Sequence, residues 1–267
     1  MSDLFSIAGI DAPEKKKKVV RKRITNDKVD FIYTDSVSEV LGDMAVKAGL
    51  KWGISSAGAK SYYGINPVTF IDNDYFNYDH QLHLSVVKKH HPKYATVQDV
   101  MTKQQCDEHK IKYHPFGQIM DWAEELREHT DNVIVIPKYM DCLDKIPDYF
   151  MWGFSAGGWL GNSSHGKGNE VGPENFIGHR THILGSSWKN QLEFLDIIGE
   201  WCVSLDNNWI SKVAVYGTFV WPDGSTGKLR EDLGLDVTNN WHTSLVISFG
   251  NIARKLNELY GGNNVHH

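Results

Sequence analysis

Short apolar runs alternate with amphipathic stretches along most of the chain, a pattern typical of strands followed by helices in a parallel sheet. Each run is rich in β-branched or aromatic residues and is bounded by polar or turn-forming residues. The pattern predicts eight strands, at residues 29–34, 51–56, 68–73, 94–99, 132–138, 149–155, 181–186 and 202–207. A helical stretch fits between several neighbouring pairs of these strands, so the sequence favours an α/β fold.

Four stretches carry the spacing and punctuation of helices. Residues 36–49 close on Gly49, residues 116–130 follow a loop, residues 186–201 have Ser187 placed as a cap, and residues 241–261 form a final helix. Eight strands with intervening helices make a compact TIM-type (β/α)8 barrel the leading prediction, with an open doubly wound sheet as the alternative. The apolar segment 212–221 leaves the strand count open.

Length and composition fit one folded unit. With 267 residues and 41% hydrophobic content, the chain can bury a large core, and we expect a basic N-terminal arm at 1–28 and a single barrel domain at 29–262. The three cysteines have no CxxC spacing, which argues against a disulfide framework or a zinc knuckle. No apolar run approaches the roughly 20 residues that span a bilayer. We therefore expect a soluble cytoplasmic protein, without a membrane partner.

The charge is distributed unevenly. The segment KKKKVVRKR, residues 15–23, holds seven positive charges, while the rest of the chain has 21 basic against 33 acidic residues, or −12. An acidic body repels a polyanion unless a local basic segment overcomes the repulsion. The arm is either a solvated tail or a phosphate-contacting element. Its candidate nucleic-acid contacts are Lys15, Lys16, Lys17, Lys18, Arg21, Lys22 and Arg23.

Many of the predicted strands end in a polar group or a glycine. In a barrel the carboxyl ends of the strands meet at one face, where active sites are built, so these distant segments should converge. A single aspartate at a strand end is more simply a cap or a loop hydrogen-bonding residue. The residues concerned are Asp72, Asp99, Lys138, Gly153, Phe154, Ser155, Gly185 and Asp206.

The ordered set of strand ends resembles the tRNA-guanine transglycosylase superfamily. FIDNDYF is similar to the family's D-S-G-G-F strand end, with Asp72 at the motif aspartate and Phe76 at its phenylalanine. YATVQD resembles the strand whose terminal aspartate, here Asp99, binds a guanine-type base. THILGS resembles the strand that ends in a Leu/Met-Gly turn, at Gly185. CVSLD is similar to the strand that carries the nucleophilic aspartate, at Asp206.

The sequence also departs from the family pattern. Asn73 and its two successors replace the small residues after the motif aspartate, and Lys138 lies near the place of the family's glutamine. The family's G-G-L-A-V-G loop has a loose counterpart in residues 152–162, and its C-terminal zinc site is absent. A compact chain without that site resembles the phage and bacterial DpdA-type transglycosylases, which insert 7-deazaguanine bases into DNA.

The resemblance implies a role for each motif residue. Asp206 would attack C1′ of the nucleotide, and Asp72 would act as general acid and base. Asp99 would accept hydrogen bonds from the base, with Asn73, Lys138, Gly185 and backbone groups at 153–155 around it. Tyr75, Phe76, Phe154 and Trp209 are candidates to stack on an extruded base, although core packing is the simpler interpretation for each aromatic.

The resemblance implies duplex DNA and a free 7-deazaguanine base of the preQ0 type as partners, in a bacterial or phage-infected cell, with no cofactor. A homodimer or an accessory protein could supply further contacts. The histidine pairs in KKHH and HRTH lack familiar ligand spacing, so no metal is expected. The Gly-rich segment 161–175 is either a lid or a surface loop. A base-excising hydrolase and a non-catalytic DNA-binding relative remain alternatives.

Overall fold

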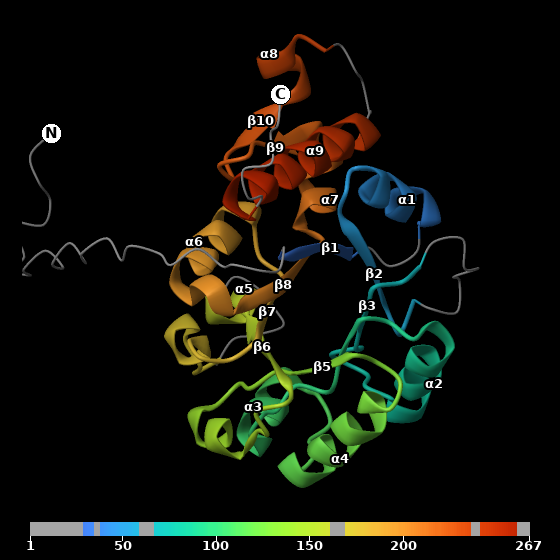
Figure 1. Cartoon of the computed structure of the whole chain (residues 1–267), viewed down its shortest axis with the longest axis vertical. Helices are drawn as coiled ribbons and strands as arrows, with labels where there is room; N and C mark the ends of the chain where they lie inside the picture. The colour runs from blue at the N-terminus through green and yellow to red at the C-terminus, as the bar shows by residue number, and fades with distance from the viewer. Residues whose placement is uncertain (1–28, 35–37, 59–66, 161–168, 236–240, 261–267) are drawn as a thin grey trace, which may run out of the picture.

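Eight parallel strands form a closed barrel in the order β1 to β8, and β8 pairs back onto β1 (Figure 1). The computed structural model describes residues 29–34, 38–58, 67–160, 169–235 and 241–260, so the basic arm lies outside the described residues. The strands are β1 Asp30–Thr34, β2 Lys51–Ser55, β3 Phe70–Asp72, β4 Tyr94–Thr96, β5 Asn132–Val135, β6 Met151–Ser155, β7 Thr181–Leu184 and β8 Cys202–Asn207. This closure confirms the (β/α)8 barrel and excludes the open sheet.

Helices surround the ring of strands (Figure 1). They are α1 Glu39–Lys47, α2 His80–His90, α3 Lys103–His109, α4 Phe116–Arg127, α5 Ala156–Trp159, α6 Trp188–Ile198, α7 Trp209–Ala214, α8 Leu229–Leu233 and α9 Trp241–Tyr260. The predicted cap is confirmed at α6, where the Ser187 side chain accepts a hydrogen bond from Asn190 N. Within the described ranges, no helix combines the length and apolar character needed to cross a bilayer.

Alternation of side chains along the strands divides the core into two layers. Six buried hydrophobic residues pack together in the barrel interior: Ile32, Phe70, Tyr94, Ile134, Ile136 and Met151. The residues between them in sequence point outward and pack under the helices. Phe31, for example, meets Trp188 of α6 edge-on at a centroid distance of 5.6 Å. Residues two positions apart on a strand therefore lie in the same layer. The last inward-facing residues of the strands, such as Asp72 and Asp206, lie at the carboxyl end of the barrel.

β4 and β5 end earlier than the sequence predicts, at Thr96 and Val135. Pairing resumes beyond them as an isolated parallel bridge, in which Val100 N donates to Ile136 O and Lys138 N donates to Val100 O. Pro137 has no N–H, but both bonds are made by the residues that flank it, so the proline is compatible with the bridge. The bridge therefore places Asp99, which precedes Val100, beside Lys138, which follows Pro137, at the cavity.

The segment after β8 adds a hairpin to the barrel. β9 Thr218–Val220 and β10 Thr226–Lys228 pair in antiparallel fashion, so part of the apolar segment 212–221 is a strand outside the barrel. The turn between them contains Pro-Asp-Gly, a typical turn sequence, and Gly224 has a φ of +86°. Trp188 Nε1 donates to Pro222 O at 3.2 Å, which ties this turn to α6.

Candidate active site at the carboxyl end of the barrel

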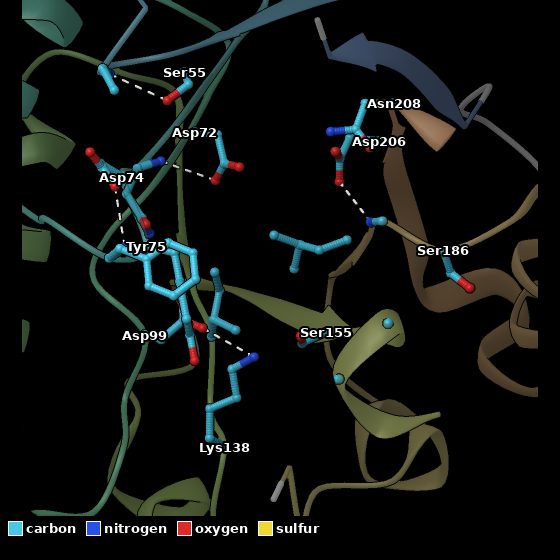
Figure 2. Close-up of a pocket in the computed structure, with 18 of the residues that line it drawn as sticks. Ser55, Asp72, Asp74, Tyr75, Asp99, Lys138, Ser155, Ser186, Asp206 and Asn208 are labelled. Atoms are coloured by element: carbon cyan, nitrogen blue, oxygen red, sulfur yellow. Dashed lines mark hydrogen bonds and ion pairs between the residues drawn. The ribbon is translucent and has the colours of Figure 1, made fainter. Parts of the chain in front are cut away.

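A polar cavity of about 400 Å³ lies at the carboxyl end of the barrel strands (Figure 2). It brings together Asp72 from β3, Asp99 from the segment after β4, and Asp206 from β8, as the strand ends predicted. Other predicted residues in its lining are Asn73, Phe76, Lys138, Ser155 and Gly185. The cavity also contains residues that sequence reasoning did not single out as site residues: Ser55, Ala57, Asp74, Ile136, Gly157, Gly158, Leu184, Ser186, Asn208 and Lys212.

The Asp206 carboxylate is held by three donors. Its Oδ1 accepts hydrogen bonds from Gly185 N at 3.1 Å and His182 Nε2 at 3.2 Å, and its Oδ2 accepts one from Thr34 Oγ1 at 2.8 Å. These donors come from β1, β7 and the turn after β7. The side chain is 10% exposed. A buried carboxylate with this donor set is held in one orientation, and its polar atoms are satisfied.

The amide side chains of Gln191 and Asn207 hold the backbone around Asp206 by hydrogen bonds. Gln191 Nε2 donates both to Asp206 O at 2.6 Å and to Gly185 O at 2.8 Å. Asn207 Nδ2 donates to Gln191 Oε1 at 2.9 Å and to Ser186 O at 2.8 Å. Gly185 has a φ of +67°, a left-handed conformation that favours glycine, so the turn aims its N–H at the carboxylate.

Asp72 lies across the cavity from Asp206 (Figure 2). Its Oδ1 accepts hydrogen bonds from Thr96 Oγ1 and Asn73 N, each at 3.0 Å. Burial and, after it, the negative charge of Asp206 raise the pKa of Asp72 to about 8, although the two hydrogen bonds oppose the shift. Asp72 is therefore protonated at neutral pH, while the opposite wall holds an oriented carboxylate.

Asp99 and Lys138 form a buried ion pair in the third part of the cavity (Figure 2). Asp99 Oδ2 and Lys138 Nζ are 3.1 Å apart, and the side chains are only 7% and 3% exposed. The ammonium group also lies 6.0 Å from the centroid of the Tyr75 ring. The pair presents a carboxylate and an ammonium group next to each other, which is a hydrogen-bond acceptor beside a donor.

The predicted aromatic contacts divide into two groups. Tyr75 and Phe76 line the cavity and meet edge-on with centroids 5.1 Å apart, and Phe76 is 43% exposed. The stacking prediction for Phe154 is wrong, because its side chain points away from the cavity and packs on Phe194 at 4.8 Å in the outer core. Trp209 likewise packs against the outer core.

Gly153 and Asn73, two other predicted contacts, have structural roles at the cavity. Gly153 lies below the cavity, and a Cβ atom there would come within 2.7 Å of Ile136 Cγ1, so the glycine allows the interior side chains to close the floor. The amide of Asn73 donates to Val97 O at 2.6 Å and braces the loop after β3. The predicted arm contacts, and residues 161–168 of the Gly-rich segment, lie outside the described residues.

Sequence reasoning missed the side chains that form hydrogen bonds with the carboxyl groups of Asp72 and Asp206. Thr34, Thr96 and His182 lie on inward-facing positions of β1, β4 and β7, where they contact Asp206 or Asp72. Alternation of side chains along the strands could have identified them. Thr34, Thr96 and His182 lie two positions from Ile32, Tyr94 and Leu184 of the barrel interior, so all three should face inward.

The described residues contain no group of three His, Cys, Asp or Glu side chains arranged to hold a metal ion. The two histidines of HRTH separate: His179 stacks on Trp152 at 3.7 Å in the outer layer, and His182 lies inside the barrel. Cys106, Cys142 and Cys202 are buried and unpaired with one another.

A closed barrel with acidic groups gathered at the carboxyl ends of its strands defines a (β/α)8-barrel protein with a candidate active site. The chain belongs to a family of unknown function (DUF6610), whose sequence profile matches residues 45–254. The match includes Asp72, Asp99, Lys138 and Asp206. No curated protein shows significant similarity to the sequence.

Solved structures with weak similarity to the chain include an isomerase and an aldolase. Phosphoribosyl anthranilate isomerase, in complex with reduced 1-(o-carboxyphenylamino)-1-deoxyribulose 5-phosphate, is 11% identical with a TM-score of 0.45, and the match covers 84% of this chain and 97% of that chain. The YdjI aldolase from Escherichia coli K12 is 10% identical with a TM-score of 0.45, covering 90% and 94%. Similarity at this level gives no information about activity.

Proposed function

We propose that this chain is a DNA-guanine transglycosylase that exchanges guanine in DNA for a 7-deazaguanine base of the preQ0 type. The observation that supports it best is the unequal pair of carboxyl groups in one cavity. Asp206 is oriented by three donors, while the pKa of Asp72 is raised to about 8. Two carboxyl groups in different protonation states are suited to breaking a glycosidic bond, because one stabilises the sugar cation and the other protonates the leaving group.

In the first half-reaction Asp206 attacks C1′ of the target nucleotide. Within the described residues, Oδ2 accepts a single hydrogen bond, from Thr34, and so retains a lone pair for the reaction. A C1′–O bond forms as the C1′–N9 bond breaks, and the electron pair of the broken bond stays on guanine. Asp72 gives its proton to the departing base, so guanine leaves neutral and a covalent sugar–Asp206 ester remains.

In the second half-reaction the free 7-deazaguanine base takes the place of guanine. Its N9 attacks C1′ and displaces the Asp206 carboxylate, while its N9 proton passes to Asp72. Both carboxyl groups return to their starting states, and no cofactor or external oxidant is required. The overall reaction conserves the number of glycosidic bonds, which makes the chain a pentosyltransferase.

The Asp99–Lys138 pair supplies the base-recognition element of this proposal. Guanine and its 7-deaza analogues carry a carbonyl oxygen at C6 beside an N1–H and a 2-amino group. Lys138 would donate to O6, and Asp99 would accept from N1–H and the 2-amino group. Adenine presents the opposite pattern at positions 1 and 6, so binding it would leave two buried charged groups without complementary partners.

The remaining lining suits a nucleotide taken out of the duplex. Phe76 is half-exposed at the cavity and Tyr75 lies against it, so both could stack on a base. Polar residues on the other side, Asn208 and Lys212, offer donors to sugar or phosphate oxygens. Bound DNA would thus be held by its backbone, while its guanine enters the cavity.

The direct test is incubation of the full chain with guanine-containing duplex DNA and radiolabelled preQ0, followed by digestion to nucleosides. We expect label in a 7-deazaguanine deoxynucleoside and an equal amount of released guanine. Quenching with denaturant during turnover should yield a protein–DNA adduct, because the ester to Asp206 is covalent. Asp206→Asn is the matched control, and it should give neither label nor adduct.

Two other outcomes would assign a different function. Guanine release with formation of abasic sites, and no label in DNA, would identify a base-excising hydrolase that uses water as the acceptor. DNA binding without guanine release across a range of substrates and free bases would identify a non-catalytic DNA-binding relative. Either result would overturn the proposed transglycosylase.

A further inference from the structure

His182 lies fully buried inside the barrel, directly beneath the cavity. Its Nε2 is 3.2 Å from Asp206 Oδ1 and its Nδ1 is 2.8 Å from Ser204 Oγ. The ring also stacks on Phe70 from β3, at a centroid distance of 5.0 Å and an interplanar angle of 21°. All three contacts are inward-facing side chains of the barrel, so the imidazole has one orientation defined on both edges and on one face.

The contacts of the ring determine where its proton lies. A neutral imidazole has one N–H and one lone pair, and a carboxylate can only accept hydrogen bonds. A lone pair on Nε2 would face the Asp206 oxygen and repel it, so Nε2 carries hydrogen. The hydroxyl of Ser204 can then donate to Nδ1, which leaves every polar atom of the group paired.

A doubly protonated ring would also donate to Asp206, but it would have a different effect on the cavity. The imidazolium charge would offset the negative charge of Asp206, and that charge is one of the causes that keep Asp72 protonated. Within the described residues, the Ser204 hydroxyl contacts only His182 Nδ1, so a second proton on Nδ1 would leave the hydroxyl hydrogen of Ser204 buried without an acceptor. The neutral ring orients Asp206 without removing its charge.

We infer that His182 is a positioning residue, a neutral Nε2–H donor held by Ser204 that aims the Asp206 carboxylate at the reacting carbon. This inference rests on the proposed function for its catalytic consequence. Its structural part, the tautomer and the hydrogen bond from Ser204 to Nδ1, stands without it. The same arrangement separates the roles of the two oxygens of Asp206: His182 and Gly185 hold Oδ1, and Oδ2 is directed to the substrate.

The first test needs no activity. In ¹⁵N-labelled full-length protein at pH 7, the two ring nitrogens of His182 are observed by two-dimensional proton–nitrogen correlation and assigned by their loss in His182→Phe. We expect a neutral ring with hydrogen on Nε2, and in Ser204→Ala the same tautomer with a shifted Nδ1 resonance, because Nδ1 loses its hydrogen bond from Ser204. An imidazolium, an Nδ1–H tautomer, or no change in Ser204→Ala would overturn the inference.

The second test measures base exchange in two substitutions at the same site. His182→Phe keeps an aromatic ring against Phe70 but has no N–H, and it should lower kcat by about 10- to 100-fold with little change in KM for the free base. His182→Gln restores a donor near the position of Nε2 and should recover most of that loss. His179→Phe is the matched control from the same segment, and it should keep the wild-type kcat because His179 lies outside the barrel.

The outcomes separate this inference from the proposed function. If wild-type protein exchanges bases and His182→Phe matches it, the positioning role is wrong and the transglycosylase stands. If wild-type protein exchanges nothing, the transglycosylase is wrong, and the nitrogen spectra still decide the tautomer. Equal losses in His182→Phe and His182→Gln, with equal falls in melting temperature, would reduce His182 to a packing residue. Should His182→Phe fail to fold, the fallback is Ser204→Ala, which keeps the ring but removes its hydrogen bond at Nδ1 and should lower kcat by a smaller factor; an unchanged kcat in that variant would overturn the role of Ser204.

Discussion

Each end of the barrel contains an aspartate paired with a lysine, but the two pairs have different surroundings. At the amino end, Lys93 Nζ and the Tyr94 hydroxyl both bind Asp30 Oδ2 at 2.9 Å, and the Lys93 side chain is 50% exposed. At the carboxyl end, Lys138 Nζ lies 3.1 Å from Asp99 with only 3% of its side chain exposed. The same two residue types thus form a partly solvated pair at one end and a buried pair at the other.

The difference distinguishes the end that holds the candidate active site. Ion pairs exposed to water contribute little to stability. A buried ion pair has a desolvation cost that can exceed its electrostatic gain, so stability alone does not explain its presence. The buried pair lies in the cavity that also holds Asp72 and Asp206. We therefore expect substitutions at the carboxyl end to change activity or stability strongly, and matched substitutions at the amino end to change both weakly.

The largest effect is expected at Asp206. Asp206→Asn keeps the size of the side chain but removes the anionic nucleophile, so base exchange should fall by at least about 10⁴-fold while DNA binding persists. Asp30→Asn, the amino-end counterpart, should leave the exchange rate near that of wild type. Nucleoside analysis after a fixed incubation measures both. Comparable losses in the two variants would remove the distinction between the ends.

Substitution of Asp72 should have the next largest effect, because Asp72 acts as a general acid and does not form the covalent bond to the sugar. Asp72→Asn should lower exchange by about 10²- to 10⁴-fold. In wild-type protein, kcat/KM should decline as pH rises through about 8, the pKa to which Asp72 is raised, because the ionised form can no longer protonate guanine. A flat rate between pH 6 and 10 would show that another group is the general acid.

The raised pKa also predicts a pH-dependent stability difference. Between about pH 4 and 8 the folded protein holds a proton on Asp72 that the unfolded chain releases, so this group's contribution to stability decreases as pH rises through that window. Asp72→Asn removes that dependence. Its melting temperature relative to wild type should therefore increase from pH 4 to pH 9. A constant difference across this range would contradict the shift.

A smaller effect separates the two ion pairs directly. Lys138→Met should lower the free energy of unfolding by about 3–5 kcal/mol, because it leaves Asp99 buried without its partner. Lys93→Met should cost no more than about 1 kcal/mol, since that lysine is half-exposed. Urea denaturation of the two variants compares them. Adding Asp99→Asn to Lys138→Met should recover part of the loss, and failure to do so would mean that Lys138 acts through packing alone.

The smallest effect concerns the basic segment 15–23, which lies outside the described residues. Replacing its seven basic residues with glutamine should weaken DNA binding, because fewer phosphates would be neutralised. The slope of log K against log salt should become shallower by about 0.9 for each phosphate that the arm no longer binds. Fluorescence anisotropy at several salt concentrations measures the slope. An unchanged slope would identify the arm as a solvated tail.

The sequence by itself determined the fold class and the chemical identity of the cavity. Apolar runs identified all eight strands within a few residues, because a strand buried on both faces must be apolar whatever its neighbours are. The same periodicity located α4 and α6, and Ser187 was recognised as a cap from local spacing. Strand-end aspartates converge by topology alone, so the sequence was sufficient to place Asp72, Asp99 and Asp206 in one site.

Only the tertiary structure decided the raised pKa of Asp72 and the orientation of Asp206. Asp72 and Asp206 belong to β3 and β8, which are distant in the chain, and the charge of one helps to set the pKa of the other only because the barrel closes. The donors to Asp206 come from β1 and β7, and no local pattern connects Thr34 or His182 with it. Phe154 and Phe76 look equally suitable in sequence, but strand pleating sends Phe154 into the outer core. Charge, hydrogen bonding and burial act through space, so they depend on the closed barrel.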